Sequence, residues 1–470
     1  MKAFSAIMIQ TVRSATRSRV FHVLFTLIIL AVFLLPMTVS GDGTAQGLVQ
    51  ISLTYSLNVV VALISTTTLW LACSLLSREI EAYNMHMVLS KPCPRWLVWL
   101  GKWAGVFVMH LFILIVSALI IYALIIWRVN RGNFSEQERQ RLEMETLVGR
   151  RRFHPEPIRL AQSVEAEYQR RISSGVVDQQ HDPQAVKNEI MRSLIAQEGE
   201  VKPGEQKTWL FKNVKTKSDD DILYLRYRMY SGDSSDTNQL LIPCLWGFLL
   251  PDQIGQTSEP FAMINQKVAG GSFQEFPVPA ARVVDKERQN QVLVRFINLP
   301  AEFWGEGQAA SAIFQAKDRP VILCKVTGFF NNYMRSLVLA AFQIAFLAAL
   351  GCTVGAAFST PVAAFTAISY LVIGLSVQAA VSAPLQNEDG SYQYKGLTEK
   401  AVHRFAQFVS VVVVSVDDLD ATSDLIKGNL VEYRRLGAAF FNLILIRSGL
   451  ISALGIWILT RRELGTVIKR

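Results

Sequence analysis

Long apolar runs occupy both ends of the chain, and a polar block separates them. About 20 helical residues cross a hydrocarbon core of roughly 30 Å, so an apolar run of that length is a candidate membrane span. Six runs are long enough, at residues 20–39, 49–76, 96–127, 337–358, 362–383 and 436–460. The pattern predicts a polytopic α-helical membrane protein with six transmembrane helices, divided between membrane regions at 1–128 and 334–470.

The polar block at 129–333 is long enough to bury a core of its own. Its first part, 135–198, is charged, and its pattern predicts helices at 135–151, 157–173 and 183–197. Farther along, apolar residues alternate with polar ones, as in Leu223, Leu225 and Tyr227. Such alternation between turn residues is typical of strands. We expect a large α+β domain whose part at 205–330 resembles a β-sandwich.

Positive charge lies beside the apolar runs of this chain, whose net charge is +9 and mean hydropathy +0.27. Lys and Arg collect on the cytoplasmic side of membrane proteins. With six spans, the basic N-terminus, the loop after the second run and the basic C-terminus share one side. We expect both termini in the cytoplasm of a plasma (inner) membrane protein. The block at 129–333 and a re-entrant segment at 384–435 are then external.

Residues 1–19 leave two interpretations open. Apolar residues recur on one helical face, which favours an interfacial helix, but a frayed basic tail fits the same sequence. A cleaved signal peptide would start in the same way, although the apolar run that follows is long for a signal core.

The loop between the second and third runs, residues 77–95, carries more charge than a bilayer core tolerates. Its charged residues are Arg78, Glu79, Glu81, Lys91 and Arg95. Apolar residues recur among them at three- and four-residue spacing, which predicts a short amphipathic helix along a membrane face. Prolines at 92 and 94 end that helix. These charges either solvate the loop and set the topology, or the helix is presented to a partner.

Several short motifs point to a known family. They are the interfacial start, Arg78-Glu79, Leu89-Ser90-Lys91-Pro92, Arg95, Gly101-Lys102, Ser359-Thr360-Pro361 and Arg461-Arg462-Glu463. With these motifs the two membrane regions resemble the permease subunit of six-helix, type-2 ABC exporters, similar to permeases associated with copper-enzyme maturation or gliding. The external block has no counterpart in the shortest members of that family.

The resemblance implies that the loop at 77–95 is a coupling helix docking in a separate ABC ATPase, with Arg78, Glu79 and Glu81 as the foremost contacts. It also implies a homodimer or heterodimer with a second permease, and export or flipping of a substrate. No Gly-x-x-x-x-Gly-Lys-Ser/Thr motif occurs in the sequence, so we expect ATP hydrolysis on the partner chain and no enzyme activity here. A second function stays open, a membrane-anchored external binding or signalling module that transports nothing.

Arg447 lies near the middle of the sixth run, where a charge costs roughly 2.5–3.5 kcal/mol on insertion scales. One interpretation places it on a translocation path, held by Asn58, Gln343 or Gln378 and favouring an anionic group on the substrate. The other lets the helix begin later, so that Arg447 becomes an interfacial anchor.

Other residues carry weaker signals. Gly351 and Gly355 on the fourth run allow close helix packing, within the chain or across a dimer. Cys244 and Cys324 could pair, although each lies in an apolar stretch typical of buried thiols. The tryptophans of the external block could line a binding face, but aromatics in strands are more often core residues. No metal-ligand or hydrolase spacing occurs, so we expect no metal and no cofactor.

Overall fold

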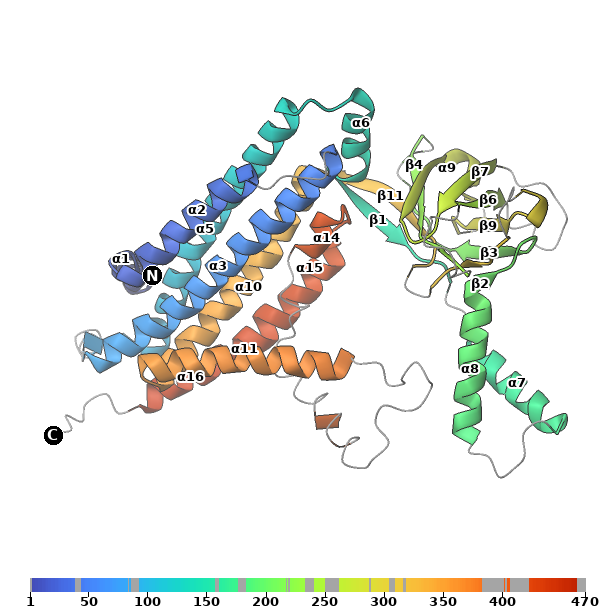
Figure 1. The fold of residues 1–470 in the computed structure, drawn as a ribbon. Helices are drawn as coiled ribbons and strands as arrows, with labels where there is room; N and C mark the ends of the chain where they lie inside the picture. The colour runs from blue at the N-terminus through green and yellow to red at the C-terminus, as the bar shows by residue number, and fades with distance from the viewer. Residues whose placement is uncertain are drawn as a thin grey trace. The chain divides into compact units, whose positions relative to one another are not determined.

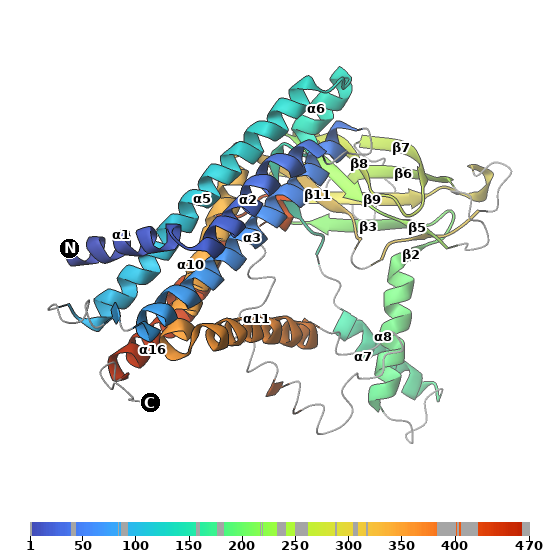
Figure 2. The same ribbon diagram turned by 60° about the vertical axis from the view of Figure 1, so that its left-hand side comes forward.

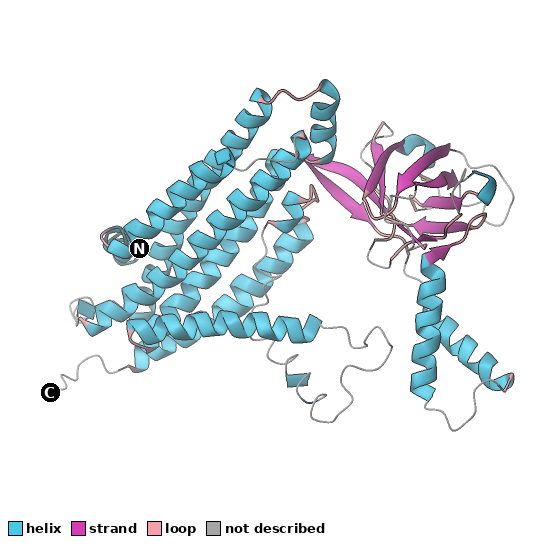
Figure 3. Cartoon of the chain, viewed as in Figure 1, coloured by secondary structure: helices cyan, strands magenta, loops and turns pink. Residues whose placement is uncertain are grey.

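The computed structural model describes residues 2–38, 44–82, 84–85, 93–156, 160–175, 183–216, 218, 220–232, 241–249, 262–286, 289–303, 309–315, 318–382, 401, 404–405 and 422–462. The chain divides into two compact units. The first comprises Met1–Gly149, Thr327–Ala383 and Gly396–Arg470, and the second comprises Arg150–Val326 and Pro384–Lys395. Figure 3 shows that the first is helical and that the strands gather in the second.

Five helices of the first unit are long and apolar enough to cross a membrane. They are α2 (Arg19–Thr38), α3 (Ala45–Glu81), α5 (Arg95–Arg131), α10 (Phe329–Ala357) and the continuous helix Tyr433–Arg461. That last helix begins as α15 (Tyr433–Ala439), continues as the π-helical η3 (Phe440–Ser448) and ends as α16 (Gly449–Arg461). Figures 1 and 2 show α2, α3, α5 and α10 running side by side. The polytopic helical character predicted from the sequence is therefore present.

Helix α11 (Thr360–Ser382) occupies the fifth predicted run but differs from the other five. Its described apolar stretch is Thr360–Gly374, within a helix of 23 residues. Figures 1 and 2 both show α11 at a steep angle to α3 and α10. Small side chains near its start, Ala363 and Ala367, are buried, whereas Phe365 and Ile368 are exposed. Among the described residues, five helices of membrane length occupy five of the six predicted runs, and the sixth crossing stays a prediction.

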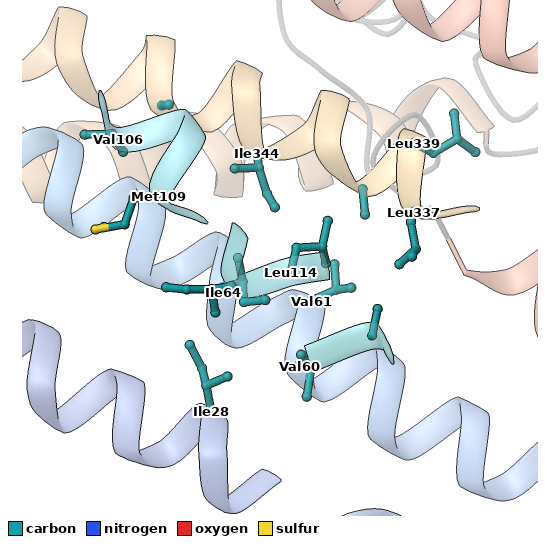
Figure 4. Close-up of a cluster of buried hydrophobic side chains, with 14 of the residues drawn as sticks. Ile28, Val60, Val61, Ile64, Val106, Met109, Leu114, Leu337, Leu339 and Ile344 are labelled. Atoms are coloured by element: carbon teal, nitrogen blue, oxygen red, sulfur yellow. The ribbon is translucent and has the colours of Figure 1, made fainter. Parts of the chain in front are cut away.

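Aliphatic side chains form the core between the long helices (Figure 4). Ile28 on α2, Val60 and Ile64 on α3, Leu114 on α5 and Ile344 on α10 are each exposed by 1% or less. Truncating such a side chain to Ala typically costs about 2–5 kcal/mol, so this core fixes how the helices pack.

Glycines allow the closest helix contacts. A Cβ at Gly351 would lie 2.5 Å from the Cβ of Ala72, and one at Gly355 would lie 2.6 Å from the carbonyl oxygen of Cys73. The Gly351–Gly355 face of α10 therefore packs on α3 of the same chain. Helix α1 (Lys2–Thr16) approaches α5 in the same manner, because a Cβ at Gly105 would lie 2.6 Å from the Cβ of Thr11.

Asn429 and Val431 lie against the start of α10. The Asn332 side chain donates to the carbonyl of Asn429 at 2.7 Å and accepts from the amide of Val431 at 2.8 Å. The short helix α14 (Ser423–Ile426) precedes these residues. The predicted segment 384–435 otherwise falls largely outside the described residues.

The second unit contains antiparallel sheets. Two have four strands, in the orders β1-β11-β4-β8 and β3-β9-β6-β7, and a small one has the order β2-β10-β5. The strands are β1 (Val148–Phe153), β2 (Glu200–Val201), β3 (Gln206–Phe211), β4 (Ile222–Tyr227), β5 (Tyr230–Ser231), β6 (Leu241–Leu249), β7 (Ala262–Ala269), β8 (Gln274–Pro279), β9 (Val292–Asn298), β10 (Ala312–Ile313) and β11 (Val321–Gly328). Its helical segments are α7 (Leu160–Ser173), α8 (Pro183–Gly199), α9 (Ala280–Val283) and the 3₁₀ turn η2 (Ala301–Phe303).

One hydrophobic core joins the two four-stranded sheets. Trp209 on β3, Trp246 on β6 and Phe296 on β9 meet Tyr227 on β4 and Phe276 on β8 in a single cluster. Trp209 and Trp246 are 6% and 0% exposed, so both are core residues, whereas Trp304 is outside the described residues. This shared core gives the unit the sandwich-like character expected from the period-two alternation.

The helix predicted at 135–151 is wrong at its end. Helix α6 (Glu136–Glu145) stops at Glu145, and strand β1 begins at Val148. Strand β1 lies beside β11, a partner more than 150 residues away in sequence, so a tertiary pairing overrides the local helical pattern.

Cys244 and Cys324 are both buried thiols, and no disulfide joins them. Burial raises the pKa of the Cys244 thiol to about 12, which keeps it protonated at neutral pH.

A polar cluster at one end of the helical unit

The ends of five helices meet at one end of the helical unit. The last turn of α3 and the ends of α10 and α16 lie beside the beginnings of α5 and α11. Side chains of Ser77, Glu79, Glu81, Arg95, Lys102 and Arg462 make the connections, and we call these six residues the polar cluster. A helix end leaves backbone groups without partners inside the helix, so charged and hydroxyl side chains stabilise such a meeting point.

An ion pair joins α3 to α5 within this cluster. The Lys102 ammonium contacts the Glu79 carboxylate, and their side chains are 2% and 14% exposed. Removing one partner of such a pair would leave a buried charge uncompensated, which typically costs about 3–5 kcal/mol. The pair therefore fixes the last turn of α3 against α5.

Two further residues of α3 contact the turn between α10 and α11. The Ser77 hydroxyl lies within hydrogen-bond distance of the carbonyls of Gly355 and Phe358, at 3.1 and 3.0 Å. The Glu81 carboxylate accepts from the amide of Thr360 at 3.2 Å. A carboxylate at the start of a helix is favoured by the helix dipole, so Glu81 stabilises the beginning of α11.

Two arginines hold the end of α16. Arg95, at the start of α5, donates to the carbonyls of Leu459, Thr460 and Arg462 at 3.0, 2.7 and 3.1 Å. Arg462 in turn donates to the carbonyl of Ala356 near the end of α10. A cation at a helix C-terminus complements the partial negative charge there. Together these bonds link the first residue of α5 to α16 and α16 to α10.

The structure changes the interpretation of the loop at 77–95. Arg78, Glu79 and Glu81 belong to the last turns of α3, so these residues form no separate amphipathic helix. We expected Glu79 to be an exposed docking contact, but it is largely buried against Lys102 because α5 packs on this turn. Arg78 and Glu81 are exposed, Arg95 is half-buried, and Lys91 lies outside the described residues.

The four residues proposed for a translocation path are distributed over several elements. Gln343 on α10 donates to the Ser65 hydroxyl of α3 at 3.1 Å, and Asn58 on α3 accepts from the Thr422 hydroxyl. Both are contacts between segments, and neither includes Arg447. Gln378 lies in α11, and nothing is described of its side chain.

Arg447 is buried at 7% exposure, near the end of η3. Fourteen residues precede it and fourteen follow it in the helix Tyr433–Arg461. The helix thus begins at Tyr433 and not later than the predicted residue 436, and the choice between a translocation path and an interfacial anchor for Arg447 stays a prediction.

Sequence reasoning missed the structural role of three cluster residues. Lys102 resembled an interfacial anchor, Ser77 an ordinary polar residue and Arg462 a topological charge. Each makes contacts more than 20 residues away in sequence, so periodicity could not reveal the partner. One feature of the sequence pointed to such a role. Lys102 is a lysine in an otherwise apolar run, and Gly101 and Gly105 beside it allow another helix to pack closely there.

Comparisons of the chain with protein-family models, with curated proteins and with solved structures find no match. Within the described part of the chain, no group of three or more His, Cys, Asp or Glu residues could hold a metal ion. The function therefore has to be argued from the polar cluster and the arrangement of the helices.

Proposed function

We propose that the chain is the membrane-spanning permease subunit of a type-2 ABC exporter. In this proposal it couples ATP hydrolysis on a separate ATPase to export or flipping of a substrate across the plasma membrane. One observation carries the proposal. The polar cluster connects both sides of the α3–α5 loop to α10, α11 and α16, so a partner that displaces this loop also displaces those helices.

The contacts of the cluster suit the transmission of force. Glu79 and Lys102 join the two helices that flank the loop, and Ser77 joins α3 to α10. Arg95 continues the connection to α16. Packed helices linked in this way move as rigid bodies rather than bending locally. Closure of an ATP-bound partner against the loop would then tilt several helices together.

Chain connectivity supports a sixth membrane crossing. Thr360 follows the end of α10 and contacts Glu81, whereas Asn429 and Val431 contact Asn332 at the start of α10. The chain between Thr360 and Asn429 thus passes from one end of the helical unit to the other. Helix α11, at about 1.5 Å per residue, is long enough for that passage. With six crossings the N-terminus, the α3–α5 loop and the end of α16 share the cytoplasmic side.

Charge on that side agrees with this orientation. Basic residues at both ends of the sequence, such as Arg13 and Arg461, lie with Arg78 at the polar-cluster end. Enrichment of Lys and Arg is the usual mark of the cytoplasmic side. The second unit, entered after α5 and left before α10, is then external.

Affinity purification in mild detergent tests the proposal. The parent chain should retain an ABC ATPase, and Arg78→Glu should weaken that association by tenfold or more, because Arg78 is an exposed cation in the last turn of α3, beside the loop. Arg434→Glu is the matched control, since Arg434 is also exposed but lies at the start of α15. Absence of an ATPase from the purified parent complex would favour the external binding module instead.

A further inference from the structure

The second unit contains a groove of about 520 Å³ beside strand β3. Its lining includes the residues of β3 from Gln206 to Leu210 and, from the end of α8, Leu194 and Glu198. Figures 1 and 2 show α8 joining the sheets next to β2 and β3. A volume of this size is within the usual range of about 300–1,000 Å³ for ligand sites, so the groove can hold a short segment of another molecule.

Strand β3 is an edge strand within the described part of the chain. It stands first in the order β3-β9-β6-β7 and pairs with β9 through Lys207–Phe296 and Trp209–Val294. In an antiparallel ladder, alternate residues direct their main-chain groups toward the partner strand. The amide of Asn298 donates to the carbonyl of Glu205 at 3.1 Å, which places Lys207 and Trp209 in the bonded set.

The remaining residues of β3 direct their main-chain groups into the groove. They are Gln206, Thr208 and Leu210. One of these outward groups already makes a hydrogen bond, because the Leu210 carbonyl accepts from the amide of Glu156 at 2.9 Å. The amide and carbonyl of Thr208 lie between these ends, at the middle of the groove wall. An extended peptide laid along β3 would pair with Thr208 as an added strand.

The charges around the groove are complementary to a basic segment. Four glutamates line it, Glu156, Glu198, Glu200 and Glu205, and the one cation among the lining residues is Lys207. Among the described residues, Lys207 pairs with Glu198 at 2.6 Å and Lys212 pairs with Glu156, so the negative charge of the rim comes from Glu200 and Glu205. Leu194 supplies apolar surface beside this acidic rim.

We propose that this groove binds an extended, basic peptide segment of a partner protein by strand addition to β3. The main chain of the segment pairs with Thr208, and its Lys or Arg side chains contact the acidic rim at Glu200. Side chains of alternate residues point to opposite faces of a strand, so the intervening residues can meet Leu194. This inference concerns the second unit and stands whether or not the chain is a permease.

The test uses the full chain in detergent and three labelled peptides, with binding followed by fluorescence anisotropy. The first is Lys-Val-Lys-Val-Lys-Val, the second is Glu-Val-Glu-Val-Glu-Val, and the third is the basic peptide with alternate backbone amides N-methylated. The basic peptide should bind at least tenfold more tightly than the other two. Equal binding of the basic and acidic peptides would overturn the charge argument, and equal binding of the N-methylated form would overturn strand addition.

Two variants locate the binding on the chain. Thr208→Pro removes an outward amide without removing a ladder bond to β9, a position where edge strands tolerate proline. It should weaken the basic peptide tenfold or more. Glu200→Lys should do the same, whereas Glu302→Lys, an exposed position on η2 with the same charge change, should not. Thermal unfolding of each variant confirms folding, and unchanged affinity in folded Thr208→Pro would refute the proposal.

Discussion

The carboxylate of Glu79 and the ammonium of Lys102 form an ion pair between the last turns of α3 and the early turns of α5. Both side chains are largely withdrawn from solvent. Their positions in sequence enclose the α3–α5 loop, so this pair closes the loop at its base. The sequence had suggested that Glu79 contacts a partner protein, whereas in the structure it contacts Lys102 of the same chain.

Breaking this pair should destabilise the chain. We expect Lys102→Met to lower the free energy of unfolding by about 3–5 kcal/mol, because Glu79 is left as a buried unpaired charge. Thermal unfolding followed by size-exclusion chromatography in detergent measures the change. The double variant Glu79→Leu/Lys102→Met should recover most of the loss. Destabilisation of the double variant equal to or greater than that of the single one would contradict the pair's role.

Gly355→Ala should weaken the contact between α10 and α3. Its new Cβ would lie 2.6 Å from the carbonyl oxygen of Cys73, a main-chain atom that cannot rotate away, so a cost of about 1–3 kcal/mol follows. Gly437→Ala on α15 is the control, since a Cβ added there would have no atom within 4 Å. The control should be neutral or slightly stabilising, because Ala favours helix over Gly by roughly 0.5–1 kcal/mol. The same thermal assay serves, and an unaffected Gly355→Ala variant would disprove the close contact.

The second unit should be accessible from outside the cell. Cysteines introduced at Ser174 and Ala281, both exposed, should react with a membrane-impermeant maleimide in intact cells. A cysteine at exposed Arg78 should react only after lysis. The reverse pattern would invert the topology and remove the basis for an ATPase at the α3–α5 loop.

Arg447→Leu should impair coupled ATP hydrolysis by the reconstituted complex more than Arg447→Gln. A polar replacement keeps hydrogen-bonding capacity in the buried site, whereas Leu removes both charge and polarity. The expected loss is tenfold or more for Leu, with assembly checked by size-exclusion chromatography. A Leu variant that assembles and hydrolyses ATP like the parent would exclude Arg447 from the translocation path.

Cys244 should resist alkylation in the folded protein. Burial raises its pKa from the ordinary value of 9.0 to about 12, so the reactive thiolate is scarce at pH 8.5. Iodoacetamide followed by peptide mass spectrometry should modify Cys244 only after denaturation, whereas half-buried Cys93 should react first. Because the folded state raises the pKa, the stability linked to Cys244 is present below about pH 9 and is lost as the pH rises toward 12. Rapid labelling of the native protein would contradict this burial.

Hydropathy and the alternation of apolar and polar residues predicted where helices and strands lie, but they did not predict which elements contact each other. The apolar runs located five membrane-length helices, because desolvation acts on local composition. Strand β4 followed from its period of two. Strand β1 could not be found in the same way, since its pairing with β11 depends on residues far away in sequence.

The contacts of the polar cluster could not be predicted from the sequence either. Charge at Arg78, Glu79 and Glu81 was visible in the sequence, but the three side chains lie in different environments. Rotation by about 100° per residue along α3 sends Glu79 toward Lys102 and leaves Arg78 exposed. Only the position of α5, set by its packing on α3 and α1, decides which of these charges remains available to a partner.

Helices α3 and α5 each contain 37 residues. At about 1.5 Å per residue each is roughly 55 Å long, whereas the hydrocarbon core is about 30 Å thick. A tilt of 40°, about the largest usual for such helices, still leaves an extent of roughly 42 Å along the bilayer normal. In a bilayer, both helices therefore project past the acyl chains. The ion pair between Glu79 and Lys102 is near the end of α3, so it lies past the acyl chains. Neighbouring protein, not lipid, then excludes water from it, and a movement of the two side chains takes no charge into the hydrocarbon core.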